Sequence, residues 1–225
     1  SETAGSLGGL VLKAIRDGGF AGATLPVNPK YRTVFGLACS RSLASVEGPI
    51  DLAVIATPAA SIPGVIADAA AARVQAAVIL TAGLGRGEGS IAEAVRLKAR
   101  ESGLRIVGPN CLGILSPQVR LNASFARRLP LDGSLALVSQ SGATAAGLVE
   151  WAWRRRIGFS GIVSLGDAID VDFGDCLDHF AEDARTSAIL LYVEGLADAA
   201  KFISAARKAA RVKPVIVMKA GRHAE

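Results

Sequence analysis

Short apolar runs typical of buried strands alternate with helix-patterned segments along almost the whole sequence. In the first half we expect strands at 23–27, 51–56, 76–81 and 104–107, and helices at 6–17, 57–73 and 90–102. In the second half we expect strands at 135–138, 161–165, 188–193 and 214–219, and helices at 142–156, 172–182 and 197–211. Such alternation produces parallel sheets with right-handed crossovers. The sequence therefore predicts an α/β chain, Rossmann-like in its first half and flavodoxin-like in its second.

The stretch 114–133 breaks this alternation, because it lacks clear periodicity and contains Pro117, Pro130 and Gly133. A chain of 225 residues is long enough for two ordinary domains. We place the domain boundary inside this stretch, with a first domain at 1–125 and a second at 126–225.

Composition and charge exclude several classes of protein. No apolar stretch reaches the ~20 residues of a membrane span, and no basic segment followed by an apolar one opens the sequence. The three cysteines are widely spaced and form no CxxC pair, which favours a reduced, cytoplasmic protein. The net charge is +5, but basic residues are dispersed and aromatic residues make up 5%, so we expect neither nucleic acid nor membrane as a partner. The abrupt start and stop suggest a portion of something longer.

The segment 139–143, Ser-Gln-Ser-Gly-Ala, follows an expected buried strand and opens an expected helix. A small-residue turn at a helix N-terminus presents unpaired N–H groups and the positive end of the helix dipole, which together bind phosphate. The predicted phosphate-binding residues are Ser139, Ser141, Gly142 and Ala143. A hydrolase elbow of the form Gly-x-Ser-x-Gly is the weaker reading, because both glycines are replaced and no suitable histidine is present.

A second segment, Gly108 to Gly113, places Asn110 and Cys111 at the end of another expected strand, where ligands of open α/β sheets bind. Cys111 is more readily a packed thiol beside a ligand than a nucleophile, since no histidine is near in sequence. Asn110 either donates a hydrogen bond at the site or stabilises the turn.

Other candidates follow strand ends or helix starts, and each has a structural alternative. Ser6 and Leu7 either meet a ligand phosphate or merely begin the first helix, and Lys30 is either a phosphate contact or a surface lysine. Thr57, Pro58 and Thr81 either lie against a dinucleotide-like ligand or serve turn chemistry.

Acidic residues in the second half raise two further questions. Glu194 either orients a catalytic imidazole or favours a helix start. Asp167, Asp170 and Asp172 match no complete calcium loop, so we expect helix capping before Phe173 and no metal site.

Taken in order, several segments resemble the α-subunit of succinyl-CoA synthetase and, more closely, the α-type portion of ADP-forming acyl-CoA (acetyl-CoA) synthetases. The matching segments are 27–30, 51–54, 108–113, 137–142, 164–167, 192–195 and 213–215. The resemblance implies a CoA-binding Rossmann-like domain followed by a flavodoxin-like ligase domain. It also implies that CoA and acyl-CoA lie near Ser6, Leu7, Lys30, Thr57, Pro58 and Thr81, with the thiol directed toward Asn110 and Cys111.

In that family an acyl phosphate forms, its phosphoryl group moves to a histidine, and the phosphohistidine charges ADP or GDP. The resemblance assigns phosphoryl binding to 139–143 and orientation of the histidine to Glu194. It further implies an oligomer with an ATP-grasp β-type portion that holds ADP or ATP with Mg. The family's histidine lies somewhat downstream of a segment matching 219–222, so His223 is not assigned the role, and this chain alone should bind CoA without turnover.

Two alternatives use similar architecture. The first is the regulatory synthetase-like portion of a protein lysine acetyltransferase, which a residue other than histidine downstream would favour. The second is an NAD-dependent Rossmann protein, which needs an acidic residue after the second strand. Asn28-Pro29-Lys30 occupies that place, so NAD is disfavoured.

Overall fold

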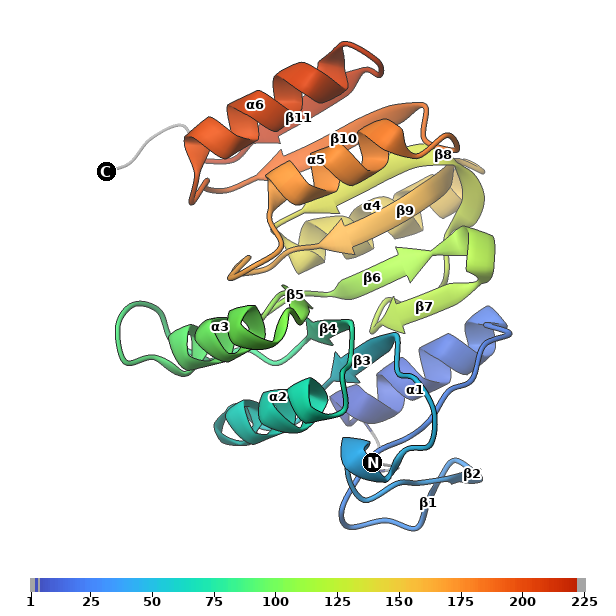
Figure 1. Ribbon diagram of the computed structural model, residues 1–225. Coiled ribbons are helices and arrows are strands. Elements are labelled where there is room, and N and C mark those ends of the chain that lie inside the picture. The colour runs from blue at the N-terminus through green and yellow to red at the C-terminus, as the bar shows by residue number, and fades with distance from the viewer. Residues whose placement is uncertain (1–2, 4, 222–225) are drawn as a thin grey trace.

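A computed structural model describes residues 3 and 5–221 and has two main sheets, besides a small two-stranded one (Figure 1). The first sheet is parallel, with the order β3-β4-β5. Its strands are β3 (Leu52–Ile55), β4 (Ala76–Ile79) and β5 (Arg105–Val107), and its helices are α1 (Leu7–Gly18), α2 (Ile62–Ala71) and α3 (Ile91–Ser102). Alternate residues of a strand face opposite sides of a sheet. Ala53 and Ile55 therefore pack against α2 and α3, whereas Leu52 and Val54 pack on the side of α1.

The second sheet has six strands in the order β11-β10-β8-β9-β6-β7. Its strands are β6 (Gly113–Ser116), β7 (Leu121–Ser124), β8 (Leu131–Ser139), β9 (Gly158–Ser164), β10 (Ala188–Val193) and β11 (Val215–Lys219). Strands β8, β9, β10 and β11 all run parallel to one another. One face carries α5 (Phe173–Glu182) and α6 (Ala199–Ala210), and the other carries α4 (Gly142–Arg154). The predicted α/β architecture is thus confirmed.

The hairpin of β6 and β7 is the main departure from the expected pattern. β6 pairs antiparallel with both β7 and β9, so the sheets are largely rather than wholly parallel. Because the hairpin belongs to the second sheet, the sheet pairing changes between Val107 and Gly113, ahead of the boundary predicted at 125/126. The hairpin nevertheless also contacts the first half of the chain, because α1 packs against β7.

Two expected segments differ locally. The strand expected at 23–27 does not form, and Val27 makes only an isolated bridge to Ser40. Pro26 has no N–H to donate, and the described segment beside it is too short to pair with a full strand. Between this segment and β3 lie the two-residue strands β1 (Thr33–Val34) and β2 (Leu37–Ala38) and the short helix η1 (Leu43–Ser45). The helix expected at 57–73 begins as the 3-10 turn η2 (Ala59–Ser61) and continues as α2. Another short helix, η3 (Pro117–Val119), joins β6 to β7.

No helix within the described residues is both long and apolar enough to span a bilayer.

Candidate functional site

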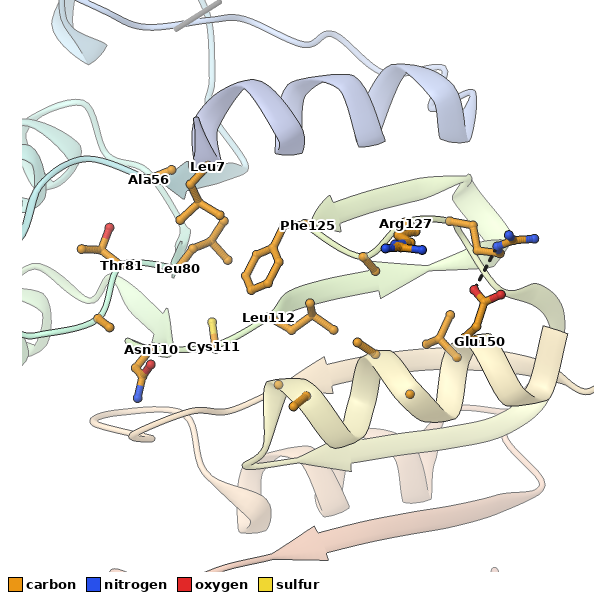
Figure 2. A pocket seen from close by; sticks show the side chains of 18 of the residues that line it. Leu7, Ala56, Leu80, Thr81, Asn110, Cys111, Leu112, Phe125, Arg127 and Glu150 are labelled. Atoms are coloured by element: carbon orange, nitrogen blue, oxygen red, sulfur yellow. Dashed lines mark ion pairs between the residues drawn. The ribbon is translucent and has the colours of Figure 1, made fainter. Parts of the chain in front are cut away.

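A cavity of about 1070 Å³ opens where the carboxyl ends of β3 and β4 face α4, and residues along the whole length of α4 line it. Figure 2 shows its lining, with Leu7, Ala56, Thr81 and Asn110 at one end and Arg127 and Glu150 at the other. The predicted site residues that line it are Leu7, Thr57, Pro58, Thr81, Asn110, Cys111, Gly142 and Ala143. Parallel strands end at the same edge of a sheet, and the hydrogen-bonded register of β3 and β4 brings these segments together.

The loop after β5 fixes Asn110 at the centre of this region. Asn110 has a left-handed φ of 58°, and its N–H donates to the carbonyl of Thr81 at 3.0 Å. Gly108 makes the turn possible, because a Cβ there would lie 2.4 Å from the carbonyl oxygen of Ile79. The loop therefore closely follows the end of β4.

Cys111 follows Asn110 in the same loop and is buried, and its Sγ donates to the carbonyl of Ile79 at 3.3 Å. Burial raises the pKa of this thiol to about 12. A thiol with this pKa stays protonated near neutral pH and is a poor nucleophile. This environment suits a packing role beside a ligand.

A glycine on another segment holds the Asn110 loop from the second sheet. Gly166, in the turn after β9, has a φ of 54°, and a Cβ there would lie 2.1 Å from the carbonyl oxygen of Pro109 and 2.4 Å from that of Asn110. The next residue, Asp167, donates its N–H to the Pro109 carbonyl at 2.9 Å. Ser164 accepts the N–H of Leu112 on its Oγ at 3.0 Å. The segment from Gly108 to Leu112, which includes Asn110, is therefore bonded directly to the second sheet. Sequence analysis assigned Gly166 no role, although it lies inside the recognised segment 164–167.

The start of α4 is organised by its two serines. The buried Ser139 hydroxyl accepts the N–H of Ser141 at 3.1 Å and donates to the Ser141 carbonyl at 2.8 Å. Ser141 is the N-cap, and its Oγ accepts the N–H of Thr144 at 3.2 Å. Both hydroxyls thus shape the turn. What faces the cavity is the first helical turn at Gly142 and Ala143, whose N–H groups have no intrahelical acceptors.

A second cavity, of about 750 Å³, lies on the other side of Asn110, which lines both. Its walls include Gln140, Gly166 and Glu194. The Gln140 side-chain oxygen accepts the N–H groups of Glu194 and Gly195 at 2.6 and 2.9 Å. Gln140 therefore fixes the turn that presents Glu194, a role that sequence analysis did not assign although Gln140 lies inside the recognised segment.

Thr57 has the one buried side-chain polar atom left without a hydrogen-bond partner in the described part of the chain, its Oγ1. Thr81 is different, because its hydroxyl already donates to the Thr57 carbonyl at 2.7 Å. An unsatisfied buried hydroxyl costs stability, so a site that keeps one favours a ligand that completes the bond.

The remaining candidates lie elsewhere. Ser6 is the N-cap residue of α1, next to Leu7, and neither Ser6 nor Lys30 lines either cavity. Asp172 caps α5, accepting the N–H groups of Gly174 and Asp175, as predicted. Asp167 pairs with Arg86 at 2.9 Å and Asp170 with Arg105 at 3.0 Å.

The far end of the first cavity was not anticipated. Phe125, Arg127, Arg128 and Glu150 line it, and the first three follow β7 in the stretch without periodicity. No sequence signal pointed to them, since only the pairing of the hairpin brings this segment opposite α4.

The sequence is similar to known proteins over its full length. Residues 1–117 match a CoA binding domain family, and residues 132–225 match a succinyl-CoA ligase like flavodoxin domain family. It is 39% identical to an ADP-forming acetate–CoA ligase of Methanocaldococcus jannaschii, covering 99% of this chain and 31% of that protein. It is 35% identical to the α-subunit of ADP-forming acetate–CoA ligase I of Pyrococcus furiosus, covering 99% of this chain and 50% of the subunit.

A solved structure gives the same result. The acetyl-coenzyme A synthetase 1 of Ca. Korarchaeum cryptofilum, in complex with phosphate and ADP, has a TM-score of 0.94 and 37% identity, covering 99% of this chain and 49% of that one. The chain thus spans half or less of the length of these relatives. With both halves matched, the chain belongs to the family of CoA-binding and succinyl-CoA ligase-like domains that forms the α portion of ADP-forming acetyl-CoA synthetases.

Proposed function

We propose that the chain binds CoA and acyl-CoA in the first cavity as part of an ADP-forming acyl-CoA synthetase. That enzyme would reversibly convert acyl-CoA, phosphate and ADP into a carboxylic acid, CoA and ATP. One observation supports this most strongly: the cavity joins the strand ends of the CoA binding domain to the N-terminus of α4. A helix N-terminus stabilises negative charge, and phosphoryl transfer depends mainly on positioning and charge stabilisation.

The residues present fit CoA. Thr57 lines the cavity and its buried hydroxyl has no protein partner, so we place a polar group of the pantetheine arm beside it. The Cys111 and Leu112 side chains form an apolar floor near Asn110. CoA would supply the thiol that carries the acyl group. Asn110, held by Thr81 and Gly166, would orient that end of the ligand.

The second cavity would receive the histidine segment of the complete enzyme. Glu194 lies there on a turn held by Gln140, and a carboxylate in this place would orient an imidazole and stabilise its charge. The N–H groups of Gly142 and Ala143 would hold the phosphoryl group. Asn110 lines both cavities, so thiol and histidine would approach from opposite sides. The complementary ATP-grasp portion would hold the nucleotide with its Mg.

Calorimetry of the 225-residue chain with CoA and with NAD tests the proposal. We expect CoA to bind and NAD not to bind. Tight NAD binding without CoA binding would overturn it.

A matched pair of variants tests the placement of CoA. Thr57→Val removes the unpaired hydroxyl, so the free energy of unfolding should rise by about 1 kcal/mol while CoA affinity falls about fivefold. Thr81→Val breaks an existing hydrogen bond and should instead lower the free energy of unfolding by about 1 kcal/mol. Unchanged CoA affinity in Thr57→Val would remove that hydroxyl from the site.

A further inference from the structure

We propose that Arg86 binds the phosphoryl group, and that the loop 83–89, which joins β4 to α3, is a lid that closes on this group. This inference rests on the proposed function, because it concerns the phosphoryl group placed near Asn110. Arg86 lines the second cavity together with Asn110 and Glu194. It therefore brings a positive charge to the cavity that we assign to the histidine segment.

The guanidinium of Arg86 is held close to the Asn110 loop by its ion-pair partner. Its Nη2 donates to Oδ1 of Asp167 at 2.9 Å. The backbone N–H of Asp167 donates in turn to the carbonyl of Pro109, and the preceding residue, Gly166, packs on the carbonyl of Asn110. Since Asn110 lines both cavities, a phosphoryl group that passes between them would meet this guanidinium.

The ion pair leaves Arg86 free to take a second anion. Within the described part of the chain its side chain donates only to Asp167, so the other N–H groups of the guanidinium are available. The Arg86 side chain is 84% exposed, and an ion pair open to solvent holds its partners only weakly. Arginine binds phosphate by paired, charge-assisted hydrogen bonds, and a cation between the phosphoryl group and Asp167 would reduce the repulsion between these two anions.

The backbone of the loop is built to move. The loop projects beside α3 (Figure 1), and residues 85–89 are all exposed. Every second residue is a glycine with a left-handed φ between 74° and 83°, namely Gly83, Gly85, Gly87 and Gly89. A Cβ at Gly87 would meet nothing within 4 Å among the described residues, so close packing does not explain that glycine. Glycines without a packing role leave the backbone many conformations of similar energy.

The loop is anchored at both ends and free at its tip. Leu84 is buried, and its carbonyl accepts a backbone N–H from α3 at 3.0 Å. The carbonyl of Gly87 accepts the hydroxyl of Ser90 at 2.7 Å, and the N–H of Gly89 donates to a carboxylate in the first turn of α3 at 2.8 Å. Between these anchors the backbone of Arg86 makes no hydrogen bond to the described residues. The position of the tip therefore depends on what the Arg86 side chain binds.

Calorimetry of the chain with inorganic phosphate tests the contact. Arg86→Gln removes the charge and should weaken phosphate binding about tenfold, as the loss of a charge-assisted hydrogen bond predicts. Arg96→Gln is the matched control, because Arg96 also lines the second cavity but lies on α3, paired with Glu93 at 3.9 Å. It should weaken phosphate binding at most about twofold, since salt screens a charge that makes no contact.

Limited trypsin digestion with mass spectrometry tests the closure. Trypsin cuts after arginine in exposed loops, so it should cleave the free protein between Arg86 and Gly87. A contact that strengthens binding tenfold leaves the tip open in about a tenth of the bound molecules, so saturating phosphate should slow this cleavage about tenfold relative to sodium chloride of equal ionic strength. Cleavage after Arg41, which is exposed and lines neither cavity, should keep its rate in the same digest.

The outcomes separate this inference from the proposed function. Equal phosphate affinity in Arg86→Gln and the parent, equal weakening by Arg86→Gln and Arg96→Gln, or cleavage at Arg86 that phosphate does not slow would overturn the lid alone. A parent chain that binds no phosphate would overturn the phosphoryl site of the proposed function, and the lid with it.

Discussion

Replacing Gly166 with alanine should both destabilise the protein and displace Asn110. The added Cβ would lie 2.1 Å from the Pro109 carbonyl oxygen and 2.4 Å from that of Asn110, so backbone must move by roughly 1 Å to restore van der Waals contact. A left-handed φ costs a non-glycine residue about 1–2 kcal/mol, and overpacking a fitted contact costs about 1–3 kcal/mol more. The free energy of unfolding should therefore fall by about 2–5 kcal/mol.

Gly103→Ala separates these two contributions. Gly103 ends α3 with a φ of 73°, but a Cβ there would contact nothing within 4 Å in the described chain. It should show only the conformational cost of about 1–2 kcal/mol. Urea denaturation of both variants gives the difference directly.

CoA affinity provides the functional readout. Displacing the Asn110 loop should weaken CoA about five- to tenfold in Gly166→Ala, equivalent to the loss of about one hydrogen bond, and Gly103→Ala should bind as the parent does. Equal destabilisation by the two substitutions would refute the close approach of Gly166 to the loop. Strong destabilisation with unaltered CoA affinity would refute its role in positioning Asn110.

Two further predictions concern a charge and the buried thiols. Lys30→Ala should weaken CoA about fivefold more than dephospho-CoA if Lys30 meets the 3′-phosphate, and equal loss in calorimetry would exclude that contact. Burial raises the pKa of Cys111 and Cys176 to about 12 from an ordinary value of 9.0. Between pH 9 and 12 the unfolded chain therefore binds fewer protons than the folded one, so stability is full below pH 9 and falls as pH rises. Denaturation midpoints at pH 8 and pH 10 should show this fall in stability. If the double variant Cys111→Ala/Cys176→Ala loses as much stability between these pH values as the parent does, the buried thiols are not its cause.

Local pattern was sufficient to predict most of the secondary structure. The runs at 51–56 and 188–193 became β3 and β10 because alternate residues of each are buried, and helical periodicity likewise identified α3 and α5. Strand ends in a parallel sheet share one edge, so the gathering of Thr57, Thr81 and Asn110 followed from the same pattern. Whether these residues bind CoA remains a prediction.

Local pattern could not predict the hairpin of β6 and β7, nor that no strand forms at 23–27. A strand without clear alternation forms only if a neighbour supplies hydrogen bonds, and β9 does so for β6, whereas 23–27 has little beside it.

The sequence by itself determined which segments are strands and helices and which turns present N–H groups, because periodicity and turn chemistry depend on near neighbours in the chain. Only the tertiary structure decided that Gly166 contacts the Asn110 loop, that Gln140 holds Glu194, and that the segment after β7 faces α4. These contacts join residues far apart in sequence, and they depend on strand order and on how closely two backbones approach, neither of which local pattern encodes.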